Sequence, residues 1–355
     1  MRVSVIHEWL TNLAGSEKVV LALLDAFPQG RLYTSMFEPE AFAELDPARV
    51  ETSFLDRIGH SPAAQTRLAP LLPLAMRSLT VAPSDLVITS FHNFALATRA
   101  PAGSCHVVYC HTPTRFVHAR SSMSEERRLG APGRVAARLY GRVDRRLGRR
   151  GDVWVANSHH IAQRIEGAYG HDARVIHPPV DIERFAAAPR SEGEHYVMVG
   201  RLVPYKRAEL AIRAFEGRGA TLHVVGDGRD RERLEELAPP NVRFLGRVDD
   251  AQLPGIMAGA RALLFPGEED FGITPVEAMA AGTPVIAYGS GGILDTVTPG
   301  RSGVFFSSPD VDAVREAIDT FEARTWDHAV IAADAARFSK QRFINAFREL
   351  AAELT

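Results

Sequence analysis

The chain has 355 residues, of which 46% are hydrophobic and 24% are charged, and its formal net charge is −2. This length allows two domains that each bury a core, and the near-neutral charge excludes bulk attraction to nucleic acid. No stretch approaches the roughly eighteen apolar residues of a spanning helix, and the apolar run of MRVSVIHEWL is too short for a signal peptide, so we expect a cytoplasmic protein.

The first half of the chain alternates short apolar runs with longer helical patterns. Helices are predicted from Glu17 to Ala26 and from Ser158 to Tyr169. Strands are predicted at 3–7, 85–90, 106–110, 152–158 and 173–179. Short apolar strands separated by helix-length segments indicate a parallel sheet that is covered on both faces.

The second half repeats this alternation after a boundary. Its predicted strands are HYVMVG, TLHVVG, VRFLG, ARALLFP and TPVIAYG. Residues 178–194 contain proline, small and charged residues without a clean period and are predicted to be the linker. We therefore expect an α/β protein with two Rossmann-like domains, 1–180 and 181–338, facing each other across a cleft. An amphipathic helix at about 339–355 is expected to pack back on the first domain.

Two cations follow the strand HYVMVG. Arg201 and Lys206 lie just past its end at Gly200, where a helix is predicted to begin. Ligands of open α/β sheets bind at the carboxyl ends of strands, so a diphosphate there would meet helix N–H groups, a guanidinium and an ammonium. The alternative is a solvated helix start, but two cations at the positive end of a helix dipole oppose its electrostatics. The pattern therefore favours an anion site.

Two glutamates accompany the helix that follows the strand ARALLFP. Glu269 is predicted to lie in the loop and Glu277 in the helix, with Thr274 and Pro275 as the N-cap and the first helical residue. Carboxylates accept hydrogen bonds from hydroxyls, which suits a ribose diol or a hexose. Taken alone, each glutamate would be interpreted as a solvent-exposed acid.

Together these segments resemble the donor-binding half of the family 4 glycosyltransferases, which have the GT-B fold. The resemblance rests on GRLVPYK, on the Glu-x₇-Glu pattern of EEDFGITPVE and on AMAAGTPVIAYGSGGILDTV. In the first half, LAGSEK is similar to the family's glycine loop after strand one, with Ala14 where a second glycine often stands. The segment YCHTPTRF resembles the family's histidine segment at the cleft. The resemblance covers nearly the whole chain.

The resemblance implies how the reacting groups are held. Arg201 and Lys206 would neutralise the departing diphosphate, which the Gly15 backbone lets approach closely. His111 would bond to the donor sugar near the reacting carbon, although a lone histidine ending a strand is often a core residue. In this family the anomeric configuration is retained, through front-face attack without an enzyme nucleophile.

The resemblance also assigns the rest of the donor. Glu277 would hold the nucleotide ribose, and Glu269 would hold hydroxyls of the transferred sugar. The nucleobase would lie near Arg247 and Val248. Backbone amides would assist Glu269 from Phe271, Gly272, Ile273 and Thr274.

We expect neither a metal nor a cofactor, the nucleotide-diphosphate sugar being a substrate. Acidic residues cluster at 268–270 and 249–250, but no Asp-x-Asp follows a strand in a phosphate-binding context. Arg201 and Lys206 can supply the charge that a divalent ion would otherwise bring. The segment Gly226–Gly228 is interpreted as a strand-to-helix turn.

A basic segment predicts contact with a membrane. Residues 127–150 contain nine arginines against one acid, Asp144, with apolar residues at near-helical spacing. Upstream, residues 68–79 form an apolar, proline-broken segment that is predicted to be a loop. A basic amphipathic helix beside an apolar loop suits an anionic surface such as the inner face of the plasma membrane. The alternative is a packed helix with a solvated basic face.

The resemblance thus implies a retaining hexosyltransferase. HEWL and EEDFGITPVEA look most like bacterial mannosyltransferases of cell-surface polysaccharide assembly, so we expect GDP-mannose as donor and a glycan or lipid-linked acceptor. One alternative is a nucleotide-sugar 2-epimerase of the same architecture, for which no distinctive acid/base set is visible. A dinucleotide oxidoreductase would need Gly-x-Gly-x-x-Gly after strand one, which AGSEK does not fit. A non-catalytic nucleotide-sugar-binding protein is the third alternative.

Overall fold

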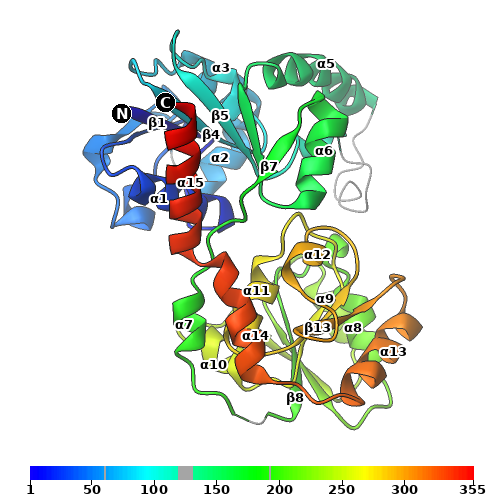
Figure 1. The fold of residues 1–355 in the computed structure, drawn as a ribbon. Coiled ribbons are helices and arrows are strands. Elements are labelled where there is room, and N and C mark those ends of the chain that lie inside the picture. The colour runs from blue at the N-terminus through cyan, green and yellow to red at the C-terminus, as the bar shows by residue number, and fades with distance from the viewer. Residues whose placement is uncertain (60, 119–130, 192) are drawn as a thin grey trace. The chain divides into compact units, whose positions relative to one another are not determined.

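The structure is a computed structural model that describes residues 1–59, 61–118, 131–191 and 193–355. The chain divides into two compact units (Figure 1). The first contains the described residues up to Pro179 together with Lys340–Thr355, and the second contains Val180–Ser339. Each unit is built around one parallel sheet.

Within the described residues of the first unit, seven parallel strands pair in the order β3-β2-β1-β4-β5-β6-β7. Every residue of β1 is buried, as expected for a strand covered on both faces. The short strands β2 and β3 were not predicted, because three or four residues of mixed polarity carry no clear period. The strands are β1 Val3–His7, β2 Arg31–Thr34, β3 Val50–Thr52, β4 Leu86–Phe91, β5 Cys105–Cys110, β6 Val153–Ala156 and β7 Ala173–Val175.

Helices cover this sheet, and the last helix of the chain is one of them. In Figure 1, α15 lies beside α1, and the Phe343 and Phe347 rings pack against Tyr109 at centroid distances of 5.8 and 5.7 Å. The segment 68–79 is helical, which corrects the predicted loop: Pro70 and Pro73 stand in first turns, where proline is tolerated. The helices are α1 Gly15–Ala26, α2 Pro62–Leu68, α3 Leu72–Ser78, α4 Arg115–His118, α5 Ala131–Gly148, α6 His159–Tyr169 and α15 Lys340–Leu354, with short 3₁₀ turns η1 Pro39–Phe42, η2 Pro47–Arg49, η3 Ala69–Leu71 and η4 Ala95–Ala97.

The second unit contains six parallel strands over residues 180–191 and 193–339, in the order β10-β9-β8-β11-β12-β13. The strands are β8 His195–Val199, β9 Thr221–Val225, β10 Val242–Gly246, β11 Leu263–Phe265, β12 Val285–Tyr288 and β13 Gly303–Phe306, of which β13 was not predicted. The helices are α7 Ile182–Ala186, α8 Ala208–Ala214, α9 Arg231–Glu236, α10 Leu253–Ala258, α11 Ile273–Ala280, α12 Ile293–Thr296, α13 Val311–Glu322 and α14 His328–Ala335, with 3₁₀ turns η6 Pro204–Lys206 and η7 Ala336–Phe338.

Part of the predicted linker belongs to the second unit. Val180 pairs with Ser339 and its N–H donates to the Phe338 carbonyl at 2.9 Å. The helix α7 follows, and its Phe185 side chain is 1% exposed within the apolar core. The prediction of a linker over 178–194 was therefore wrong for this part, because one turn of helix is too short to show an apolar period.

A buried carboxylate fixes the region where β1 and β4 end. Glu8, directly after β1, is fully buried, and its Oε1 accepts the backbone N–H groups of His92, Asn93, Phe94 and Ala95 at 2.7–3.1 Å. Its Oε2 lies 2.6 Å from His92 Nδ1. Burial by itself raises the pKa of Glu8, but His92 and the N–H donors outweigh it and hold the pKa well below its usual range. Neither Glu8 nor His92 was among the predicted site residues.

Glu8→Gln should therefore destabilise the protein in a pH-dependent way. Burial lowers the pKa of His92, but Glu8 outweighs it and the net pKa is raised. Stabilisation from Glu8 is present above its ordinary pKa of 4.5 and is lost as pH falls towards its folded value. Stabilisation from His92 is complete below 6.5 and is lost as pH rises through its raised value. We expect Glu8→Gln to lower the free energy of unfolding by about 3–5 kcal/mol between pH 4.5 and pH 6.5, and by less outside this range.

Urea denaturation of both proteins across this pH range measures the difference in the free energy of unfolding. Glu51→Gln is the matched control, because Glu51 is exposed and its ion pair with Arg31 should contribute about 0–1 kcal/mol. A loss that does not change with pH would contradict the assignment of charge to Glu8.

Candidate active site

Polar side chains gather where β1 and β4 of the first unit end. His7 Nδ1 lies 3.0 Å from Ser90 Oγ, and Ser90 Oγ lies 2.8 Å from His111 Nε2. His7 and Ser90 are fully buried, whereas His111 is half-buried. Burial, assisted by the nearby His92 and His7, lowers the pKa of His111 to about 3, so its imidazole is neutral. The candidate His111 therefore stands in a polar cluster and not in the apolar core.

The loop before α1 joins this cluster through Glu17. Gly15 is the first residue of α1, two residues before the predicted start. One oxygen of Glu17 accepts hydrogen bonds from the Ala14 N–H at 3.2 Å and the Ser16 hydroxyl at 3.0 Å. The other lies 3.6 Å from His7 Nε2. The glycine-loop candidate and the histidine candidate are thus connected through buried groups.

In the second unit, the cations after β8 lie in a tighter turn than predicted. Lys206 ends the 3₁₀ turn η6, and α8 begins only at Ala208, after Arg207 in the left-handed region at φ 52°. The two cations thus lie in the loop and the 3₁₀ turn that lead into α8, the helix that was predicted to begin here. Arg201 is exposed, and its Nη2 donates to the Tyr205 hydroxyl at 3.1 Å. This loop presents the guanidinium outward and places Lys206 deeper.

Lys206 forms an ion pair with Glu269, which follows β11. The side chains are 15% and 23% exposed, so the pair is only partly screened by water. The ammonium also lies over the Tyr205 and Phe265 rings, 5.6 and 5.8 Å from their centroids. The fold thus brings together two site candidates that are remote in sequence.

Glycine packing fixes the backbone that carries Glu269. The Gly292 N–H donates to the Glu269 carbonyl at 2.8 Å. A Cβ at Gly291 would stand 2.6 Å from the Glu269 oxygen, and one at Gly292 would stand 2.3 Å from the Asp270 oxygen. Only glycines permit this approach without a shift of backbone. The segment GSGG therefore holds the Glu269 loop in place.

The helix α11 begins two residues earlier than predicted. Gly272, at φ 94°, is its N-cap and Ile273 its first residue, so the prediction of Thr274 as N-cap was wrong. Glycine is free to adopt this backbone conformation, which shifts the start. Thr274 and Glu277 are half-buried, and Phe271 is buried with its ring 5.5 Å from that of Phe338. Phe271 therefore offers a ligand its backbone and not its ring.

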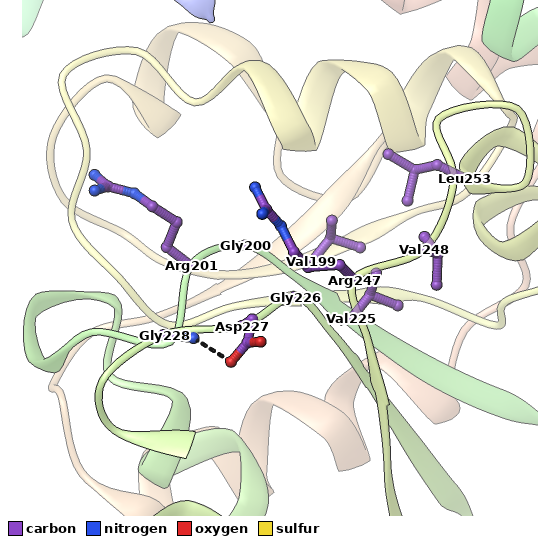
Figure 2. A pocket seen from close by; sticks show the side chains of 10 residues that line it. All are labelled: Val199, Gly200, Arg201, Val225, Gly226, Asp227, Gly228, Arg247, Val248 and Leu253. Carbon is purple, nitrogen blue, oxygen red and sulfur yellow. Dashed lines mark hydrogen bonds between the residues drawn. The ribbon is translucent and has the colours of Figure 1, made fainter. Parts of the chain in front are cut away.

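A cavity of about 490 Å³ opens beside the ends of β8, β9 and β10 (Figure 2). Its volume lies within the roughly 300–1,000 Å³ of small-molecule sites. The segment Gly226–Gly228 lines it as a turn, with the Gly228 N–H donating to Asp227 Oδ1 at 2.7 Å. A Cβ at Gly226 would stand 2.0 Å from the Gly200 oxygen, so the two strand ends touch through glycine. The cavity is lined by Val199, Gly200, Arg201, Val225, Gly226, Asp227, Gly228, Arg247, Val248 and Leu253.

Metal-ligand side chains do not gather in the part of the chain that the structure describes: no group of three or more His, Cys, Asp or Glu there could hold an ion.

Two family models match consecutive parts of the chain. The model described as Glycosyltransferase Family 4 matches residues 13–184, and the one described as Glycosyl transferases group 1 matches residues 180–338. A GDP-mannose-dependent alpha-(1-6)-phosphatidylinositol monomannoside mannosyltransferase of Mycolicibacterium smegmatis is 33% identical over 205 residues, covering 49% of this chain and 54% of that protein. A 2-deoxystreptamine glucosyltransferase of Streptomyces kanamyceticus is 35% identical over 133 residues, 34% of either chain. The matched segments thus span about half the length of the first relative and about a third of the second.

Solved structures are similar over the full length. Anabaena HepE in complex with UDP has a TM-score of 0.71 at 19% identity, covering 99% of this chain and 100% of that one. Sucrose-phosphate synthase from Thermosynechococcus elongatus has a TM-score of 0.76 at 19% identity, covering 100% and 99%. At 19% identity the similarity establishes the fold alone, and it confirms the predicted fold class. The chain belongs to the family 4 glycosyltransferases and has their GT-B fold of two Rossmann-like domains.

Proposed function

We propose that this protein is a retaining hexosyltransferase that uses a nucleotide-diphosphate sugar. The observation that carries the proposal is that one loop contributes two cations to the candidate site. Arg201 lines the cavity, and Lys206 in the same loop forms an ion pair with Glu269. A diphosphate needs fixed cations beside a cavity that accepts its nucleoside. Both lie at the carboxyl ends of parallel strands, where open α/β sheets bind ligands.

The second unit would hold the donor in three parts. The nucleobase enters the cavity beside Val248, and Glu277 accepts hydrogen bonds from the ribose hydroxyls. Arg201 and Lys206 bind the diphosphate and stabilise the charge that develops as it departs. Glu269 then accepts hydrogen bonds from the sugar hydroxyls, with backbone amides from Phe271 to Thr274 beside it.

The first unit would act on the sugar. The Gly15 backbone at the start of α1 would let the diphosphate approach closely, and the first turn of a helix favours an anion. Neutral His111 hydrogen-bonds the sugar near its reacting carbon. The acceptor attacks the same face from which the diphosphate leaves, and a phosphate oxygen takes the acceptor's proton, so the anomeric configuration is retained.

GDP-mannose is the donor that we propose, with a lipid-linked or other glycan acceptor in cell-surface polysaccharide assembly. The similarity to the mannosyltransferase from M. smegmatis supports mannose, and the name of that enzyme includes phosphatidylinositol monomannoside, a lipid-linked sugar. The structurally similar HepE was solved in complex with UDP, so the guanine base of the proposed donor is to be tested by comparing the binding of GDP and UDP. A 2-epimerase of the same fold would convert the donor without an acceptor, and a binding protein would leave it intact.

Arg201→Ala and Lys206→Ala should each slow transfer about 100- to 1,000-fold, because each removes one preorganised donor to the departing charge. Steady-state kinetics with GDP-mannose and an acceptor glycan measure the loss. Lys340→Ala is the matched control, since Lys340 is an exposed cation paired with Asp25 on the surface of the first unit. Turnover close to wild type in both the Arg201 and the Lys206 variant would remove the diphosphate assignment.

Transfer should continue in excess EDTA, because Arg201 and Lys206 supply the positive charge at the diphosphate. The measurement is the initial rate with and without chelator, followed by addition of Mg²⁺ or Mn²⁺. An enzyme that stops with EDTA and recovers with either ion depends on a metal, and the charge-substitution argument would fail.

We further propose that the first unit contacts an anionic membrane through α5. Arg142 and Arg145 are exposed on this helix, and Arg149 is exposed directly after it; the side chains of residues 131–139 lie outside the described part. Burial lowers the pKa of Arg150, and Arg77, Arg99 and Arg146 lower it further, so arginines from α3, the loop after η4 and α5 share one region. Exposed Leu74 and Val143 add apolar area to these elements. This combination suits anionic lipid headgroups over an apolar interior.

Within residues 1–59, 61–118, 131–191 and 193–355, no helix is both long and apolar enough to cross a bilayer.

Replacing Arg142, Arg145 and Arg149 with Gln should release the protein from anionic vesicles, because each arginine near the surface contributes about 1 kcal/mol. Vesicle sedimentation at low and high salt measures this, and transfer to a short water-soluble acceptor should be unchanged. A matched control replaces three exposed arginines of the second unit, Arg243, Arg301 and Arg324. If the wild-type protein stays in the supernatant at both salt concentrations, these arginines form an ordinary solvent-exposed face and the proposed membrane contact is wrong.

A further inference from the structure

Three buried side chains lead from His111 into the first unit. His111 Nε2 lies 2.8 Å from Ser90 Oγ, which lies 3.0 Å from His7 Nδ1. Glu17 Oε1 lies 3.6 Å from the opposite nitrogen of His7, Nε2. Ser90 and His7 are 0% exposed and Glu17 is 3% exposed, so water does not compete for these contacts. The proposed function above assigns a task to His111 alone.

The charge of Glu17, at one end of this series of side chains, determines in which direction its hydrogen bonds are donated. Burial raises the pKa of Glu17, but its contacts with His7 and the nearby N–H groups outweigh this and lower the pKa overall, so the carboxylate is ionised. A carboxylate beside Nε2 of His7 favours a proton on that nitrogen, and in the neutral imidazole Nδ1 then carries the lone pair. Two oxygens of Ser90 face Nδ1, the hydroxyl at 3.0 Å and the carbonyl at 3.3 Å, and of these only the hydroxyl can donate.

This direction determines which nitrogen of the His111 ring carries the proton. Once the Ser90 hydroxyl donates to His7, its oxygen is left to accept from His111 Nε2. The pKa of His111, lowered to about 3 by burial and by His92 and His7, means that its ring carries one proton. That proton is therefore on Nε2, and Nδ1 carries the lone pair. Glu8, Glu17, His7 and His92 are the ionisable groups whose charges reach this ring.

Glu17 connects this series to the glycine loop as well. Its second oxygen accepts the Ala14 N–H and the Ser16 hydroxyl, which flank Gly15. One carboxylate thus holds the loop proposed to face the diphosphate and, through His7 and Ser90, orients the proposed sugar contact. A carboxylate that fixes an imidazole through its far nitrogen does the same in hydrolytic triads.

We propose that Glu17, His7 and Ser90 are positioning residues that hold His111 as the tautomer protonated at Nε2, so that Nδ1 accepts a hydrogen bond from a hydroxyl of the donor sugar. The tautomer assignment does not depend on the proposed function. The sugar contact rests on the proposed function.

The tautomer can be read directly from long-range ¹H–¹⁵N correlation spectra of the full chain labelled on histidine, with His111→Gln to assign the signal. We expect one protonated and one unprotonated ring nitrogen in His111 near neutral pH, with the proton on Nε2. A proton on Nδ1 would overturn the proposal. This measurement needs neither donor nor acceptor, so it remains decisive if the chain transfers no sugar.

Ser90→Ala removes the acceptor of the Nε2 proton. We expect the His111 spectrum to show a mixture of tautomers and kcat to fall about 10- to 100-fold, the loss seen when the hydrogen-bond partner of a metal-binding histidine is removed. The donor KM should change much less. Ser4→Ala is the matched control, since it also removes a buried hydroxyl, bonded to Ser84 at 2.7 Å in the same sheet.

The two readouts together separate the possible failures. A Ser90→Ala variant with the wild-type His111 spectrum overturns the positioning role, whatever happens to kcat. A mixed spectrum with unchanged kcat overturns the sugar contact at Nδ1 and leaves the tautomer assignment. If Ser90→Ala does not fold, Glu17→Gln tests the same series from its other end, with the same expected loss of the Nε2-protonated form.

Discussion

The burial of the Glu8 carboxylate is the constraint around which the first unit's strand ends are arranged. A buried charge is costly unless hydrogen bonds and an opposite charge surround it. Four consecutive backbone N–H groups and His92 do so here, and they all come from the residues that follow β4. The β4 end therefore has one conformation, and Ser90, two residues before His92, is held where it meets both His7 and His111.

The second unit holds its strand ends by close packing of backbones. Gly226 meets the Gly200 carbonyl, and Gly228 meets that of Leu202, at distances that exclude a Cβ. Gly291 and Gly292 meet the carbonyls that surround Glu269 in the same way. Rigid loops of this kind position a ligand at low cost in conformational entropy. They also keep Lys206 and Glu269 in contact, so that a diphosphate and a sugar would meet a cation and an anion already in place.

The two units therefore divide the proposed chemistry according to charge. The described candidates of the first unit are hydrogen-bonding groups around a neutral imidazole, whereas the second unit presents Arg201 at a cavity and Lys206 in the same loop. Charge that develops on a departing diphosphate needs fixed cations. A sugar hydroxyl needs a donor or acceptor of defined direction, which an imidazole of one tautomer supplies.

The sequence by itself determined the parts of this protein that depend on local pattern. Apolar runs of the strongly buried strands, the cations after HYVMVG and the Glu-x₇-Glu spacing are each visible within a dozen residues, and they were enough to predict the fold class and the family. Strands β2, β3 and β13 and the helix α7 were missed because three to five residues show no period. The tertiary structure alone decided which side chains meet. The Lys206–Glu269 pair, the hydrogen bonds to Glu8 and the series from Glu17 to His111 join residues from different elements of the fold. The protonation of these groups depends on burial, which no local pattern records.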